Sequence, residues 1–136
     1  MAEFNDLISA ESDGSLSFGN YMLHTKQKLD AFDFDGDIYK VKTFSELTRL
    51  EKNEAFVYES VPGTEVSEFK ADRESMDFIV EGAEDAQITV GLEEETEYRI
   101  YIDDVAVGKM RTGLGGKLSV YVELEPGDKV HVVIRK

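Results

Sequence analysis

Hydrophobic and polar residues alternate with a period of two along most of this chain. The pattern is clearest in the last third, where the expected strands are residues 98–102, 105–107, 118–122 and 130–134. Successive residues of a strand point to opposite faces of a sheet, so this alternation predicts strands with one buried face. Pairs such as Asp103 with Asp104 and Pro126 with Gly127 separate these strands and indicate turns.

Earlier segments repeat the alternation at spacings of about 8 to 12 residues. The expected strands there are residues 15–23, 38–42, 45–51, 55–58, 76–80 and 87–90. No gap is long enough for repeated helical crossovers, which favours antiparallel pairing. About ten short strands of this kind predict an all-β fold, an antiparallel β-sandwich of the immunoglobulin/fibronectin-like or jelly-roll-like kind.

One early segment is compatible with both helix and strand. Leu47 and Leu50 have the spacing of a helical turn, and Ser45 could cap it. Asn53, however, tolerates a positive φ and follows at the place where a hairpin would turn. We therefore predict a strand, a turn and a second strand here.

The N-terminal residues carry a helical rather than an alternating pattern. Phe4, Leu7 and Ile8 lie at i, i+3 and i+4, which predicts a short amphipathic helix over residues 2–10. So short a helix is marginal in water unless its apolar stripe docks on the domain's own core or on another copy of the chain. We favour the first, and divide the chain into an N-terminal arm, residues 1–12, and a single sandwich domain, residues 13–136.

Composition narrows the classes of partner. The chain of 136 residues has 29 acidic against 15 basic residues, a formal charge of −14, which favours solubility and opposes binding to nucleic acid or to an anionic membrane. The lysines and arginines form no cluster in the sequence.

The absence of cysteine removes disulfides, thiolate nucleophiles and Cys-based metal sites. No secretory signal precedes the first strands and no apolar run reaches membrane-spanning length, so a cytoplasmic location is expected.

Two resemblances go beyond these patterns. Residues 91–98, 102–104 and 112–118 resemble the strand starts and hairpins of small β-sandwich modules appended to bacterial polysaccharide-degrading enzymes. The whole chain, from residue 5 to 135, is similar to a family of short proteins from anaerobic gut Firmicutes that sometimes carry the label endosialidase. Its carrying segments are residues 17–21, 36–43, 57–64 and 80–89. The first resemblance implies a scaffold and transfers no catalytic residue.

The residues do not support an endosialidase. Sialidase-like sites use three arginines for the substrate carboxylate with a Tyr–Glu pair, whereas the arginines here are scattered one per segment, at Arg49, Arg73, Arg99, Arg111 and Arg135. The chain has no tryptophan and is too short for a multi-blade propeller. No hydrolase elbow, phosphate loop or dinucleotide fingerprint is present. We expect no enzymatic activity and no cofactor.

Metal sites are also not expected. Residues 33–37 are rich in aspartate, but an EF-hand loop requires glycine at its sixth position and glutamate at its twelfth, where this segment has Ile38 and Phe44. Phe32 and Phe34 alternate with the aspartates, which indicates the wet side of a strand end. His24 and His131 lie far apart in sequence and have no companion at ligand spacing.

A binding face is the remaining functional candidate. In the last third of the chain, one face of each expected strand would belong to the core. The residues on the opposite, outward face include Arg99, Tyr101, Tyr121, His131 and Val133. This outward group could be covered by the same chain, contact another subunit or stack on a sugar ring. The leading hypothesis is a non-enzymatic interaction or structural module that associates with itself, and the alternative is a carbohydrate-binding accessory domain.

Overall fold

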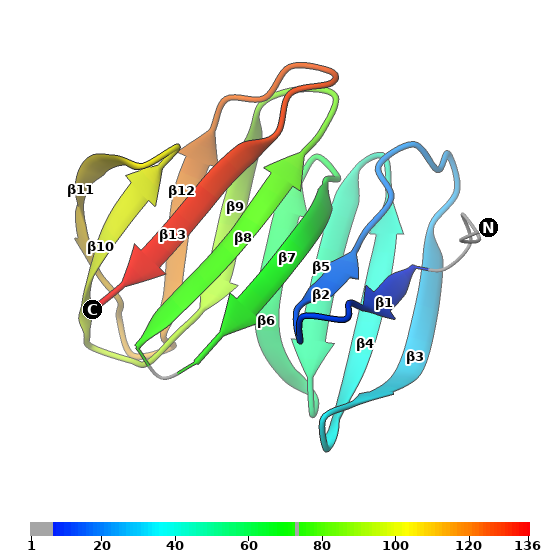
Figure 1. Cartoon of the computed structure of the whole chain (residues 1–136), viewed down its shortest axis with the longest axis horizontal. Coiled ribbons are helices and arrows are strands. Elements are labelled where there is room, and N and C mark those ends of the chain that lie inside the picture. The colour runs from blue at the N-terminus through cyan, green and yellow to red at the C-terminus, as the bar shows by residue number, and fades with distance from the viewer. Residues whose placement is uncertain (1–6, 73) are drawn as a thin grey trace.

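The computed structural model of the chain describes residues 7–72 and 74–136 and contains thirteen β-strands in this part. They form two antiparallel sheets that pack face to face (Figure 1). In order across the sheet, the seven-stranded sheet consists of β1 (Ile8–Ala10), β2 (Leu16–Phe18), β7 (Glu65–Ala71), β8 (Ser75–Glu81), β13 (Val130–Arg135), β10 (Glu97–Ile102) and β11 (Val105–Arg111). The six-stranded sheet consists of β12 (Lys117–Val122), β9 (Ala86–Gly91), β6 (Ala55–Val61), β5 (Leu47–Lys52), β4 (Asp37–Phe44) and β3 (Gln27–Phe34). The prediction of an all-β, two-sheet fold is confirmed.

The core lies between the sheets and is built from the inward residues of both. Tyr58 of β6 contacts Phe18 of β2 and Phe78 of β8 edge to face, with ring centroids 5.2 and 5.6 Å apart. Aromatic pairs prefer this geometry, and it adds to the stabilisation that comes from burying the rings. The inward residues predicted from the alternation in the last third of the chain are buried, with Ile102 packed against the edge of the core.

A buried polar network also ties strands of the six-stranded sheet to the segment that joins β6 to β7. The Tyr58 hydroxyl and the Ser60 hydroxyl each lie 2.8 Å from Thr64 Oγ1. Thr48 Oγ1 donates to the Thr64 carbonyl and lies 2.8 Å from Thr43 Oγ1. Buried polar groups are costly unless they are hydrogen-bonded, and these groups satisfy one another. Every buried side-chain nitrogen and oxygen in the described part of the chain has a partner.

The prediction of an N-terminal helix is wrong. Residues 2–6 of that prediction lie outside the described residues, but Ile8 to Ala10 form strand β1, with Ile8 directly opposite Phe18. Pairing with β2 satisfies the backbone of this segment and still buries Leu7 and Ile8, whereas a two- to three-turn helix would have to be held by its apolar stripe alone.

The ambiguous segment around Leu47 is a hairpin, as predicted. It forms β5 and β6, joined at Asn53 and Glu54, whose φ angles are 51° and 69°. Asparagine adopts this left-handed conformation more readily than most residues. Among residues 7–72 and 74–136, no helix has the length and apolar character needed to cross a membrane.

The sheet order leaves two long strands at opposite ends of the molecule. β11 is one edge of the seven-stranded sheet and β3 is one edge of the six-stranded sheet, and they lie at the two ends of the longest axis (Figure 1). Every residue of β11 is exposed, and in β3 only Phe32 and Phe34 are partly buried. Each of these edges presents backbone N–H and C=O groups that no neighbouring strand in the described chain pairs.

Candidate functional site

Strand pairing brings four of the five predicted binding residues onto one face. Arg99 and Tyr101 lie on β10 and His131 and Val133 on β13, on the outer face of the seven-stranded sheet, with Tyr101 directly opposite Val133. Tyr121 belongs to β12 in the other sheet. The period-two pattern assigns each residue to the outside but does not show which sheet it belongs to.

The two tyrosines differ in how much of each ring is accessible. The guanidinium of Arg135 lies 5.1 Å from the ring centroid of Tyr101, so one side of this half-buried ring already has a cation–π partner. The Tyr121 ring is 64% exposed, and its hydroxyl donates to Asp85 Oδ2 at 3.1 Å. This hydrogen bond to Asp85 raises the pKa of Tyr121. Tyr121 is therefore the tyrosine of this pair with an accessible ring.

His131 is held between two acidic residues. Its Nε2 lies 2.7 Å from Asp77 Oδ1, and its Nδ1 lies 3.8 Å from Asp104 Oδ1. The short contact between Nε2 and Asp77 joins β13 to β8, and Nδ1 faces the Asp104 carboxylate.

The outer face also carries a row of three cations that the sequence alone does not reveal. Lys109 of β11 lies directly opposite Arg99 of β10, and Arg99 lies directly opposite Arg135 of β13. Neighbouring strands are about 4.8 Å apart, so like charges in register repel one another and weaken the pairing. Among residues 7–72 and 74–136, no carboxylate lies within salt-bridge distance of these three side chains.

A second row, in the other sheet, shows how such repulsion is normally offset. Lys28, Lys42 and Arg49 are in register across β3, β4 and β5. Here Arg49 Nε lies 3.0 Å from Glu51 and Arg49 Nη1 lies 3.6 Å from Glu59. The row formed by Lys109, Arg99 and Arg135, hereafter the cation row, differs in that none of its members has an acidic partner like that of Arg49 among residues 7–72 and 74–136.

A cleft of about 570 Å³ lies between the two sheets, at the end where β3 turns into β4 and β7 into β8. Its walls are apolar core side chains, among them Phe34, Phe69 and Met76. Two rim charges are paired with each other, since Lys52 Nζ lies 3.5 Å from Asp37 Oδ2. The volume suits a small apolar ligand. The cleft was not anticipated from the sequence, because its lining comes from loops and strands of both sheets.

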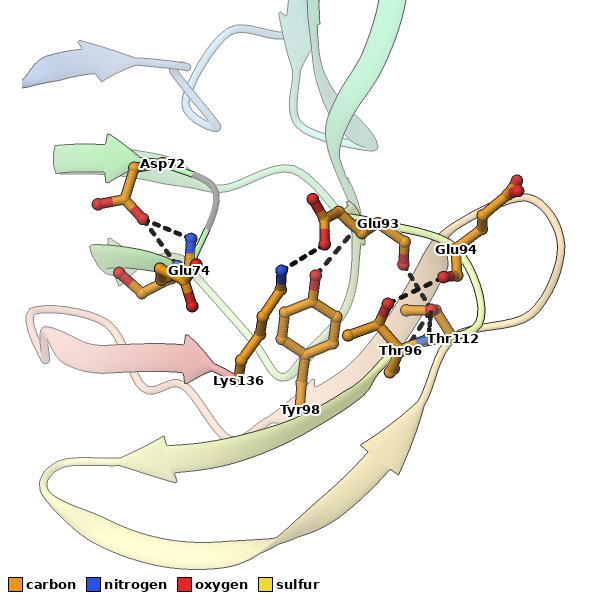
Figure 2. Close-up of polar contacts among 9 residues, drawn as sticks. Asp72, Glu74, Glu93, Glu94, Thr96, Tyr98, Thr112 and Lys136 are labelled. Carbon is orange, nitrogen blue, oxygen red and sulfur yellow. Dashed lines mark hydrogen bonds and ion pairs between the residues drawn. The ribbon is translucent and has the colours of Figure 1, made fainter.

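The polar groups beside this cleft serve the structure (Figure 2). Lys136 forms an ion pair with Glu93, and the backbone N–H of Glu93 donates to the Tyr98 hydroxyl at 3.1 Å. Thr112 Oγ1 donates to the Glu93 carbonyl at 2.6 Å and accepts from the Thr96 N–H at 3.0 Å. The Thr112 bonds hold the connection between β9 and β10 against the segment that follows β11.

Hydrogen bonds within the chain also hold the turn before β8, at the rim of the cleft. Asp72 Oδ1 accepts the backbone N–H groups of Glu74 and Ser75, at 2.8 and 2.9 Å (Figure 2). These two hydrogen bonds lower the pKa of Asp72, so its carboxylate closes the turn before β8 as an acceptor. In the described part of the chain, no group of three or more histidine, aspartate or glutamate side chains is placed to hold a metal ion.

The exposed edge strand β11 combines apolar and basic residues. Val105, Val107 and Met110 are 62%, 55% and 40% exposed, and the two charged residues of the strand are Lys109 and Arg111. Sequence reasoning predicted a strand only over residues 105–107 and therefore missed this edge. The continued alternation of Lys109 with Arg111 around Met110 is the pattern that could have extended it.

Comparison of the whole chain with models of protein families, with curated proteins and with solved structures finds no match in any of the three. The geometry of the strands, faces and edges is therefore what bears on the function of this chain.

Proposed function

We propose that the chain is a non-enzymatic interaction module that associates with further copies of itself. The observation that carries this proposal is β11, an edge strand exposed along its whole length, with three large apolar side chains. An exposed edge offers backbone donors and acceptors to another strand, and soluble proteins usually shorten or cover such edges. Addition of a strand from a partner is a common way to use one.

The rest of the molecule supports an interaction role over catalysis. The polar groups around His131 and along the cleft rim bond to one another, which suits a rigid scaffold. The acidic surface and the local cation row provide opposite charges on one chain, and complementary charge steers association between copies.

A matched pair of variants tests the proposal. Val107→Lys adds a charge to the β11 edge, whereas Leu114→Lys adds the same charge at an apolar loop residue that is 75% exposed and lies outside β11. Light scattering after size-exclusion chromatography should give a mass above that of one chain for the wild type and for Leu114→Lys, and a lower mass for Val107→Lys. A wild-type mass equal to one chain at every concentration would overturn the proposal.

Carbohydrate binding is the second candidate, and one observation favours it. Tyr121 presents an exposed ring beside the Asp85 carboxylate. Sugars commonly stack on an aromatic ring, while a nearby carboxylate accepts hydrogen bonds from their hydroxyl groups. A glycan array compared between the wild type and Tyr121→Ala tests this candidate. Binding that is present in the wild type and lost in the variant supports it, and no binding to any glycan removes it.

A further inference from the structure

We infer that β11 of one copy pairs with β3 of another, so that copies join head to tail. This inference rests on the proposed self-association and names the two surfaces that would meet. β11 and β3 have seven and eight residues, are the longer edge strand of their respective sheets, and lie at the two ends of the long axis (Figure 1). They belong to different sheets, and at opposite ends of the molecule they are placed to meet only between copies.

Charge selects β3 over a second β11 as the partner. The charged residues of β11, Lys109 and Arg111, are both basic. β3 carries two acids, Asp30 and Asp33, and its one lysine, Lys28, lies near the start of the strand, where it ends the second row of cations. Two β11 strands in contact would bring four cations together without an acid on either strand. Opposite charges across neighbouring strands stabilise the pairing, and like charges weaken it.

The side chains on each face of the two edges also match. Lys109 lies opposite Arg99 and Asp33 lies opposite Ile38, so both are on solvent faces. Met110 lies opposite the buried Tyr98 and Leu29 opposite the buried Val41, so both lie on core faces. A strand pair with the two solvent faces continuous would place Asp33 near Lys109, and one of its neighbours Phe32 and Phe34, both on the core face, near Met110. The exposed apolar residues at each edge would then be covered.

This contact would also offset the repulsion within the cation row. Lys109 ends the row at the β11 edge, beside Arg99 and then Arg135. An aspartate from β3 of the next copy would extend the row with the opposite charge. Because the two surfaces differ, the contact leaves one free β11 and one free β3 at the ends of each assembly. Such a heterologous contact propagates unless the rotation between copies closes a ring.

Charge exchange tests this arrangement. Lys109→Glu with Arg111→Glu reverses the β11 edge, and Asp30→Lys with Asp33→Lys reverses the β3 edge. Each double variant alone should need about tenfold higher concentration to associate, an effect of about 1.4 kcal/mol, because its altered edge repels the native partner edge. The quadruple variant, which carries both reversals, should associate again, since its two edges are once more complementary. Far-UV circular dichroism checks that each variant folds.

Three outcomes separate the two proposals. A monomeric wild type removes both the self-association and the head-to-tail contact. A wild type that associates, with no effect of the Asp30 and Asp33 substitutions, keeps the self-association and overturns the role of β3. A β11 variant that associates more strongly than the wild type likewise overturns the charge selection.

Engineered cysteines provide a second test that does not depend on charge. The chain contains no cysteine, so a variant with both Lys109→Cys and Asp33→Cys has only these two thiols. Under mild oxidation it should give a ladder of covalent oligomers on a non-reducing gel, while each single variant should give little covalent dimer. Dimers from Lys109→Cys alone, without a ladder from the double variant, would show β11 to β11 contact and overturn the inference.

Discussion

Lys109 of β11 lies directly opposite Arg99 of β10 on the solvent face of the seven-stranded sheet. Arg99 has a second like-charged neighbour, Arg135 of β13. Cross-strand pairs contribute about 0.2 to 1 kcal/mol each, with an unfavourable sign for like charges. The inward residues of β10 and β13, among them Tyr98, Ile100 and Val132, are part of the buried core, and their burial offsets this repulsion. The repulsion between these like charges also makes this face a measurable source of instability.

Removing the central charge of the cation row should stabilise the isolated chain. Arg99→Gln is expected to raise the free energy of unfolding by about 0.5 kcal/mol, because it removes two like-charge contacts at once. Urea denaturation at low salt measures this change, and the gain should shrink as salt screens the charges. Lys40→Gln is the control, since Lys40 lies opposite Glu51 and its loss should bring no gain. A destabilised Arg99→Gln protein would contradict this account of the row.

The buried hydroxyl of Tyr58 should contribute measurably to stability. Tyr58→Phe keeps the ring contacts with Phe18 and Phe78 but removes the hydrogen bond to Thr64 Oγ1. Loss of one partner in a buried network should cost about 1 to 2 kcal/mol. Thermal or urea denaturation of Tyr58→Phe beside Tyr121→Phe, an exposed tyrosine, isolates the effect of burial. Equal stability of the two variants would show that the network adds nothing.

Glu65 should make the fold less stable as the pH rises. Burial, and then repulsion from Glu81 directly opposite on β8, raise the pKa of Glu65 above its ordinary value of 4.5. The folded state therefore holds this proton more tightly than the unfolded state. The contribution of Glu65 to the free energy of unfolding falls as the pH rises from about 4.5 through the raised pKa, and stays lower above it.

Glu65→Gln tests this assignment because it removes the titrating group and the repulsion together. The variant should be more stable than the wild type near pH 7, and the difference between the two should narrow as the pH falls toward 4.5. Urea titrations across this range measure both. Glu123→Gln, on the exposed segment after β12, is the control for loss of one negative charge. A wild type that is more stable than Glu65→Gln near pH 7 would refute the prediction.

Gly91 should be a position where even one methyl group is not tolerated. It ends β9, and an added Cβ would collide with the carbonyl oxygen of Phe56. The colliding atom belongs to the backbone, so it can move only if the paired strand shifts. Gly91→Ala should therefore lower the free energy of unfolding by about 2 kcal/mol. Gly113→Ala, where a Cβ meets nothing within 4 Å, should change stability little. Melting temperatures of the two variants compare them directly, and similar values would contradict the proposed collision.

The local pattern was sufficient for much of the fold. Period-two alternation identified the strands around Ile100, Val120 and Val132 and the residues they bury, because burial of one face imposes that alternation. The tolerance of asparagine for a positive φ favoured a hairpin turn at Asn53, and Asn53 has a φ of 51° between β5 and β6. The helix predicted from Leu7 and Ile8 was wrong, because adjacent apolar residues near a terminus also suit a short strand that pairs with β2.

The candidate surfaces depend on pairing between distant strands, which one sequence does not encode locally. Arg99 and Arg135 are 36 positions apart in the chain, from 135 − 99, but directly opposite in the sheet. Tyr121 has the same alternation as Tyr101 and lies in the other sheet. That β11 is an edge follows only from the complete strand order, so neither the cation row nor the free edge could be predicted before the topology was known.

Self-association through the exposed edge strands should make the mass of this chain depend on its concentration. Sedimentation equilibrium of the wild-type chain over a wide range of concentrations measures that mass. A weight-average mass that rises with concentration, and that passes the mass of a dimer without reaching a plateau, is the predicted result. A mass equal to that of a single chain at every concentration would contradict this self-association.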